Sequence, residues 1–282
     1  MTAPDMTTPD MTTPDMTTKA KRKTNTLRAE SRPSQLSGGA GRRKPKAKRR
    51  SGRDRKKRRV SAGWHRLVKW TLLVVLAGPA LVMLVYSVLP PPVTPLMLIR
   101  ALEGEEIDYR WRPLEEISPH LAHAVIASED NRFCEHWGFD FEEFLVIFED
   151  WREGERPRGA STITMQTTKN ILLWPKRQVV RKLLEAWLTP QLELLWSKRR
   201  ILEVYLNVAE MGPGIYAAEA AAQRHFGKPA AALTLREAAL LAAALPSPRR
   251  ASPGQPTAYL NGRVPIIRQR IDQLGPMLAC AS

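Results

Sequence analysis

The strongest hydrophobic signal in the chain is an uncharged apolar run from Trp70 to Leu89. At about 1.5 Å per residue, a helix over this run would cross the roughly 30 Å hydrocarbon core of a bilayer. Gly78 and Pro79 in its middle favour a kink, which membrane-spanning helices tolerate. A cleaved signal peptide is disfavoured, because the run is long and is followed by prolines instead of small residues. We therefore expect a single transmembrane helix over residues 64–90.

Beyond residue 110 the apolar residues recur mainly at helical spacing, and no pair of strands is convincing. Thr234 and Glu237 form a capping box, Ser197 is a candidate N-cap, and Gly227 and Gly275 fit as C-caps. One predicted helix begins directly after Ser118. The others cover residues 141–151, 177–188, 197–208, 216–226, 234–246 and 266–274. The pattern predicts one all-α domain over residues 107–282, after a linker over residues 91–106 that starts as a stiff Pro-rich spacer.

The net charge of +16 lies almost wholly in the first 60 residues. This part opens with the repeat Met-Thr-Thr-Pro-Asp at residues 6–10 and 11–15, whose regular prolines prevent a helix. We expect residues 1–63 to form a disordered basic tail. Such a tail is typical either of nucleic-acid binding or of the cytoplasmic flank of a membrane helix. The adjacent apolar run favours the second interpretation, with the N-terminus in the cytoplasm and the C-terminal domain outside it.

The chain has two cysteines, Cys134 and Cys280. Two cysteines form neither a disulfide framework nor a zinc site. An extracytoplasmic location would permit a bridge between them, but we expect both to be unpaired.

Two adjacent carboxylates, Glu129 and Asp130, end a predicted helix that Ser118 can cap and that Pro119 begins. The helix macrodipole disfavours negative charge at this end, so a functional use is one explanation for the pair. A solvated surface pair is the alternative.

A second polar stretch follows at residues 159–170, rich in hydroxyl, amide and ammonium groups. A helix of this composition suits the lining of a cleft that binds a sugar or a phosphate. An ordinary capped amphipathic helix is the alternative. Further on, Arg177, Arg181 and Glu185 recur at four-residue spacing with Lys182 beside them, which predicts either a charged site or a surface salt-bridge ladder.

These stretches together resemble the motifs of the peptidoglycan glycosyltransferase family, over about residues 107–275. The segment 198–207, otherwise an amphipathic packing helix, resembles the fourth motif together with Gly212. Met165 departs from the family pattern, where a Gln is frequent. Ala217 replaces a usual Gly, so we expect no special backbone angle there. The first three motifs read Glu129-Asp130-x-x-Phe133-x-x-His136-x-Gly138, Gly159-x-Ser161-Thr162-Ile163-Thr164-x-Gln166-x-x-x-Asn170 and Arg181-Lys182-x-x-Glu185.

The resemblance implies a lysozyme-like helical domain of the monofunctional biosynthetic type, without a penicillin-binding domain, whose Ser-x-x-Lys and Lys-Thr-Gly motifs are absent from the sequence. The implied reaction polymerises lipid II into β-1,4 glycan strands, with inversion and release of undecaprenyl pyrophosphate. The implied partners are lipid II, the growing strand, membrane lipid and proteins of cell division or elongation, and nucleic acid is not among them. The implied location is the inner membrane, with a periplasmic domain.

The resemblance also implies a role for each motif residue. Glu129 is the base and Asp130 supports it, while Phe133 and His136 brace the motif. Glu185 is a second acid, close to the pyrophosphate, and is the candidate for positioning a divalent cation such as Mg or Mn. The pyrophosphate and substrate contacts implied are Lys169, Arg177, Arg181 and Lys182, with Ser161, Thr162, Gln166 and Asn170 as hydrogen-bond donors or acceptors.

Two other functions stay open at this point. A lysozyme-like lytic enzyme would also use two carboxylates, but it has no evident need for cations at positions 169 and 177. A non-enzymatic membrane scaffold would keep the motifs for packing alone.

Overall fold

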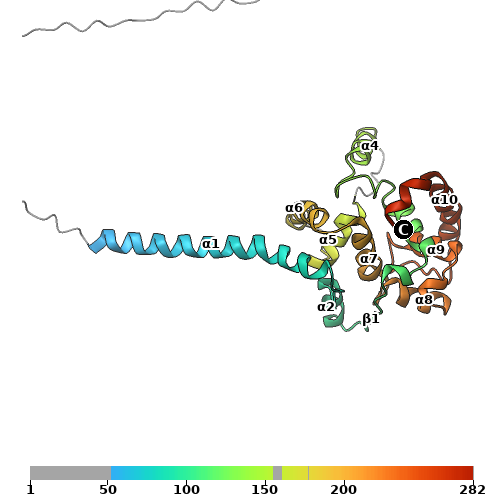
Figure 1. Ribbon diagram of the computed structural model, residues 1–282, viewed down its shortest axis with the longest axis horizontal. Coiled ribbons are helices and arrows are strands. Elements are labelled where there is room, and N and C mark those ends of the chain that lie inside the picture. The colour runs from blue at the N-terminus through green and yellow to red at the C-terminus, as the bar shows by residue number, and fades with distance from the viewer. Residues whose placement is uncertain (1–51, 155–160, 177, 282) are drawn as a thin grey trace, which may run out of the picture. The chain divides into compact units, whose positions relative to one another are not determined.

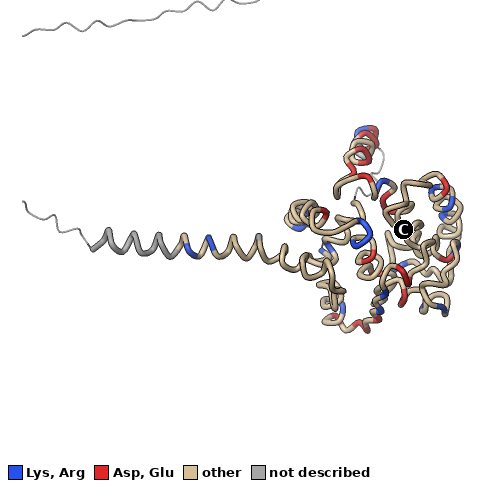
Figure 2. Tube along the Cα trace, viewed as in Figure 1, with Lys and Arg blue, Asp and Glu red and all other residues tan. Residues whose placement is uncertain are grey.

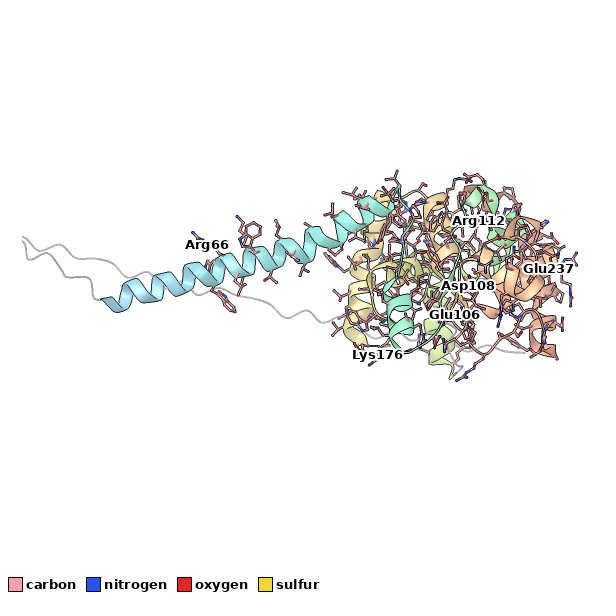
Figure 3. The ribbon with its side chains drawn as sticks, turned by 90° about the horizontal axis from the view of Figure 1, so that it is seen from below. Arg66, Glu106, Asp108, Arg112, Lys176 and Glu237 are labelled. Atoms are coloured by element: carbon pink, nitrogen blue, oxygen red, sulfur yellow. A yellow bond between two sulfur atoms is a disulfide. The ribbon has the colours of Figure 1, made fainter. Side chains whose placement is uncertain are left out.

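Most of the apolar run near the N-terminus lies in a long helix, α1 (Gly52–Tyr86; Figure 1), which continues through Pro79 and ends before the expected boundary at residue 90. The structure, a computed structural model, describes residues 52–154, 161–176 and 178–281. In this part of the chain, Trp64–Tyr86 is the one segment long and apolar enough to cross a membrane. Arg66 and Lys69 lie in its first turns, and no charged residue follows in the helix (Figures 2 and 3). The helix begins before the expected boundary at residue 64, and residues 1–51 lie outside the described part.

The expected linker contains a second helix, α2 (Pro95–Leu102), which packs against α5. Thr94 caps it by accepting a hydrogen bond from the backbone N–H of Met97, and Pro95 occupies the first position. Thr94 and Pro95 together favour the start of a helix. The prolines that precede them made this signal hard to recognise in the sequence.

The C-terminal domain is helical, as predicted, and several predicted caps are present. Ser197 accepts a hydrogen bond from Arg200 N–H, Thr234 and Glu237 form the capping box, and Gly227 ends its helix in the left-handed conformation. The helices are α3 (Pro119–Glu129), α4 (Phe141–Arg152), α5 (Ile163–Leu172), α6 (Val179–Leu195), α7 (Lys198–Val208), α8 (Ala218–Phe226), α9 (Leu235–Ala244) and α10 (Ala258–Leu274), with short 3-10 turns η1 (Leu114–Glu116), η2 (Ala230–Ala232) and η3 (Gly275–Ala281).

Some local predictions were wrong. The Ser118 hydroxyl does not cap α3 and instead donates to the carbonyl of Leu233. Helix α10 begins at Ala258, well before the predicted start at Ile266, and runs through Pro265. Thr257 caps this start, and packing against α3 and α9 holds the helix across the proline.

A small sheet is present where no strands were expected. It contains β1 (Asp108–Tyr109), β2 (Glu210–Gly212) and β3 (Ile215–Tyr216) in the order β1-β3-β2. Strand β3 pairs in parallel with β1 and antiparallel with β2. The strands are too short to give an alternating pattern, so the sequence carried no periodic signal for them.

Ala217 follows β3 directly and has φ 75° and ψ 149°, a region that residues other than glycine rarely occupy. The prediction of an ordinary backbone angle at this position was therefore wrong. The chain must turn from β3 straight into α8, and the buried junction imposes this conformation on whichever residue occupies it.

Two groups of helices build the domain (Figure 1). In one, α3, α9 and α10 pack on each other, and in the other α5 packs between α6 and α7. The groups meet where the C-terminal end of α3 lies against the first turn of α5.

A disulfide joins Cys134, in the loop after α3, to Cys280 in η3, with the two Cα atoms 5.7 Å apart. The expectation that both cysteines are unpaired was wrong. Turn η3 packs on α3 and α7, which brings together two residues 146 positions apart. The separation of the two cysteines in the sequence could not indicate that they lie together in the fold.

Candidate active site

Asp130 links the C-terminal end of α3 to the start of α5. One carboxylate oxygen, Oδ2, accepts a hydrogen bond of 2.9 Å from the backbone N–H of Ile163, the first residue of α5. The positive end of the α5 macrodipole favours this negative charge. His136 Nε2 lies 2.9 and 3.1 Å from the two carboxylate oxygens. Gly138 N–H donates to His136 Nδ1, which leaves the ring proton on Nε2 to be donated to Asp130.

Lys198 supports the same loop from α7. Its Nζ donates to the carbonyl of His136 at 2.6 Å and to Glu193 Oε1 at 2.7 Å, and lies 4.7 Å from the centre of the buried Phe133 ring. The sequence reasoning missed this residue. The one signal for it was its place at the start of the fourth motif-like segment, which we interpreted as packing.

Gly138 ends the loop with φ +86°, where a side chain would be strained. A Cβ at this position would also lie 2.6 Å from the Cγ2 of Thr189 on α6. Thr162 links this loop to α5. Its hydroxyl donates a hydrogen bond of 2.7 Å to the carbonyl of Gly138 and accepts one from Met165 N–H, which caps α5. The Thr162 hydroxyl is thus bonded within the protein.

Glu129 has a different set of partners from its neighbour. Gln166 Nε2 on α5 donates to Glu129 Oε2 at 3.0 Å and to the carbonyl of Ser161 at 3.3 Å. The Gln166 carbonyl oxygen accepts a hydrogen bond of 3.2 Å from the hydroxyl of Tyr205 on α7. Gln166 was expected to contact substrate, but both of its N–H groups point to protein acceptors.

Burial raises the pKa of Glu129, and the charge of Asp130 adds to the rise. The hydrogen bond from Gln166 and the charges of Arg263 and Lys169 lower the same pKa and offset part of the rise. A carboxylate with a raised pKa is a stronger base near neutral pH than an exposed one.

Lys169 lies on α5, where its ammonium interacts electrostatically with both Glu129 and Glu185. Burial is the largest effect and lowers its pKa, with Arg181 and Lys182 acting in the same direction. Among the described residues, no hydrogen bond or ion pair within 4 Å engages this ammonium. The group is therefore available to an anionic ligand.

Glu185 is 2% exposed and holds two cations in place. Arg181 Nη1 donates to one carboxylate oxygen and Lys182 Nζ to the other, the latter at 2.6 Å. Lys182 also donates to the Ser161 hydroxyl at 2.9 Å, and Arg181 Nε donates to the carbonyl of Lys176, a residue labelled in Figure 3.

With Lys169, these groups form a site of net positive charge. Arg177 lies outside the described residues, and its membership of this site stays a prediction.

Some polar side chains of the run on α5 belong to the site, and others form hydrogen bonds within the protein interior. The hydroxyls of Thr164, Thr167 and Thr168 donate to Glu193 and to carbonyls of α5 itself. Asn170 follows Lys169 on the helix and is largely buried. Much of the hydroxyl content thus serves packing, which composition alone could not distinguish.

The described residues supply no complete set of ligands for the divalent cation considered for Glu185. They contain no group of three or more His, Cys, Asp or Glu side chains that could hold a metal ion. Both Glu185 oxygens accept hydrogen bonds from cationic groups, so a Mg²⁺ ion at this site would take most of its oxygen ligands from substrate phosphates and water.

A family model described as "Transglycosylase" matches residues 97–272, a range that runs from α2 to α10. The chain belongs to the transglycosylase family. This result, with the helical content, confirms the all-α, lysozyme-like fold class.

Curated relatives named "Biosynthetic peptidoglycan transglycosylase" are similar over most of their length. The protein from Caulobacter vibrioides is 53% identical over 191 residues, which cover 68% of this chain and 83% of the relative. That from Rhodospirillum centenum is 54% identical over 205 residues, covering 71% and 89%. That from Ectopseudomonas mendocina is 50% identical over 217 residues, covering 75% and 89%. Every described site residue lies within the family match.

Proposed function

We propose that the protein is a peptidoglycan glycosyltransferase that polymerises lipid II into β-1,4 glycan strands during cell-wall biosynthesis. The observation that carries this proposal is the placement of Lys169, within electrostatic reach of both the half-buried Glu129 and the buried Glu185. A proton acceptor and an anion site are thereby next to each other. Family membership and the names of the curated relatives support the same reaction.

In this reaction, the 4-hydroxyl of the incoming disaccharide attacks the anomeric carbon of the growing strand, and Glu129 takes the hydroxyl proton. A well-placed base contributes roughly 10²–10⁴ in rate. The new bond forms on the face opposite the leaving undecaprenyl pyrophosphate, so the anomeric configuration inverts.

The leaving pyrophosphate gathers negative charge as the bond breaks, and fixed cations stabilise that charge. Lys169, Arg181 and Lys182 supply them, with Arg177 as a further candidate. Glu185 acts by holding Arg181 and Lys182 in place. Ser161 and Asn170 are the remaining candidates for hydrogen bonds to the substrate.

A membrane-bound donor agrees with the surface of the domain. Helix α6 exposes Val179, Val180 and Leu183, and α4 exposes Phe141 and Phe144. Exposed apolar side chains on these two helices suit contact with lipid, and a lipid-linked substrate stays at the bilayer. With α1 as the anchor, the reaction takes place next to its substrate.

For localisation we propose a single-pass protein of the inner membrane with a cytoplasmic N-terminus and a periplasmic domain. The basic residues before the apolar segment support this orientation. The Cys134–Cys280 disulfide supports it independently, because disulfides persist in oxidising compartments. Docking of cell-division or elongation proteins stays a prediction.

The test is polymerisation of labelled lipid II by the full-length protein in detergent or vesicles. Glu129→Gln should slow the reaction by about 10²–10⁴-fold, because it removes the base and keeps the shape. Glu115→Gln is the matched control, since Glu115 is an exposed glutamate that pairs with Arg199 on the surface.

Unchanged polymerisation by Glu129→Gln would contradict the assignment and favour the scaffold alternative. The lytic alternative predicts release of sugars from purified cell wall without consumption of lipid II. The raised pKa of Glu129 would suit a lytic acid as well, so both substrates belong in the experiment.

A further inference from the structure

We propose that Tyr205 is a positioning residue for the reaction: its hydroxyl fixes the orientation of the Gln166 amide, which in turn holds Glu129 as the proton acceptor. Tyr205 touches no reacting atom and acts through two hydrogen bonds. The proposal rests on the function proposed above, because it assumes that Glu129 is the base.

The partners of Gln166 allow one orientation of its amide. The Ser161 carbonyl can only accept a hydrogen bond, and so can the ionised Glu129 carboxylate, so both require the NH₂ end of the amide. The carbonyl end then faces Tyr205, whose hydroxyl can donate to it. Each N–H and the carbonyl of this amide has a partner, and the arrangement leaves no donor of Gln166 for a substrate.

The Tyr205 hydroxyl is a dependable donor because of its surroundings. The side chain is 1% exposed, so bulk water cannot replace it. Burial, together with the charges of Glu129 and Asp130, raises the pKa of Tyr205 well above its ordinary value, and the hydroxyl keeps its proton. Without this donor, the Gln166 carbonyl would lose its hydrogen-bond partner, and the amide would be held less firmly against Glu129.

The charged groups that face Glu129 set the sign of the expected effect. Asp130 on its own helix raises the pKa of Glu129, whereas Lys169 on α5 and Arg263 on α10 lower it. The Gln166 hydrogen bond also lowers it. Loss of that hydrogen bond therefore raises the pKa of Glu129. Because the base must be deprotonated, the acid limb of the rate profile moves to higher pH.

The experiment compares Tyr205→Phe with Tyr216→Phe in the full-length protein. Tyr216 is also buried, and its hydroxyl has no hydrogen-bond partner among the described residues, so its loss should change little. For Tyr205→Phe we expect kcat at neutral pH to fall about tenfold with KM for lipid II unchanged, as for a lost hydrogen bond to a charged system. The acid limb of kcat/KM should move up by about one pH unit.

A second variant separates positioning from packing. Gln166→Met removes the amide at similar volume and should give the same shift of the acid limb, and adding Tyr205→Phe should shift it no further. Independent, additive shifts would overturn the proposal. So would an acid limb at the wild-type pH in either variant, or equal losses of rate in the two Tyr→Phe variants.

The two proposals fail in different ways. If Glu129→Gln polymerises lipid II like the wild type, the base assignment itself is wrong. If Glu129→Gln is inactive and Tyr205→Phe keeps the wild-type acid limb, the base stands and the positioning role is wrong.

Discussion

Glu129 and Asp130 are neighbours in the sequence, yet they have separate tasks because the helix ends between them. Asp130 turns inward to His136 and to the first N–H of α5, where its charge is compensated. Glu129 remains on the last turn of α3, beside Gln166 and within reach of Lys169. Asp130 holds the loop, and Glu129 is the residue that we propose as the base.

This division predicts the behaviour of Asp130→Asn. Removing the negative charge of Asp130 removes one of the effects that raise the pKa of Glu129, so the acid limb of the rate profile should move to lower pH. The direction is opposite to that expected for Tyr205→Phe. The same change weakens the charged contacts to His136 and α5, and should lower the free energy of unfolding by about 1–3 kcal/mol. A pH–rate series and a denaturant titration measure the two effects, and an acid limb that moves upward would contradict the electrostatic argument.

At the scale of elements, the junction between β3 and α8 carries a conformation that its residue does not favour. Ala217 is wholly buried there at φ 75°. Glycine adopts this region freely, whereas other residues incur about 1–3 kcal/mol of strain.

We therefore expect Ala217→Gly to raise the free energy of unfolding by about 1 kcal/mol or more. Ala222→Gly is the matched control, because Ala222 is equally buried but lies inside α8, where glycine costs roughly 1 kcal/mol. Urea or thermal unfolding of the two variants measures the difference. Equal destabilisation by both would show that the junction is not strained.

The elements that the sequence predicted well are those with local signals. The capping box at Thr234, the N-cap at Ser197 and the terminal glycine at Gly227 each act within one turn of a helix, and all are present. The features that were missed depend on distant partners. Ser118 bonds to Leu233, α10 crosses Pro265 because α3 and α9 support it, and Ala217 takes its angle from the strand before it.

The same distinction applies to the site. The motifs singled out Glu129 and Lys169, and the structure places them within electrostatic reach of each other. The support of the loop by Lys198 and the alignment of Gln166 by Tyr205 join α7 to distant segments. Spacing along one helix cannot reveal such contacts. The motif positions were therefore predictable, but most of their hydrogen-bond partners were not.

At the scale of the molecule, the domain is bonded to the end of α1. Trp196 Nε1 donates to the carbonyl of Met83 at 2.7 Å, and Arg200 donates to the carbonyls of Tyr86 and Leu89. Met83 and Tyr86 lie in the last turn of α1, where carbonyls have no partner within the helix, so these side chains satisfy them. The contacts bond the C-terminal end of α1 directly to the loop and helix that follow α6.

The disulfide acts over the whole domain, because it joins the loop of Asp130 and His136 to η3. Reduction, or Cys134→Ser with Cys280→Ser, should lower the free energy of unfolding by about 2–4 kcal/mol, since the open chain gains freedom when unfolded. Unfolding curves with and without dithiothreitol measure this, and the double serine variant is the control that reductant should not affect. Two titratable thiols in the untreated folded protein would contradict the bridge.

The long separation of the two cysteines also sets an order of events during biogenesis. A chain translocated from its N-terminal side exposes Cys134 long before Cys280, which lies 146 residues later. In the orientation proposed above, the loop after α3 therefore remains uncrosslinked until nearly all of the domain has crossed the membrane. With the periplasmic location proposed above, formation of this bridge depends on the oxidation machinery of that compartment and on completed export, so cells impaired in either should accumulate the protein with both thiols reduced.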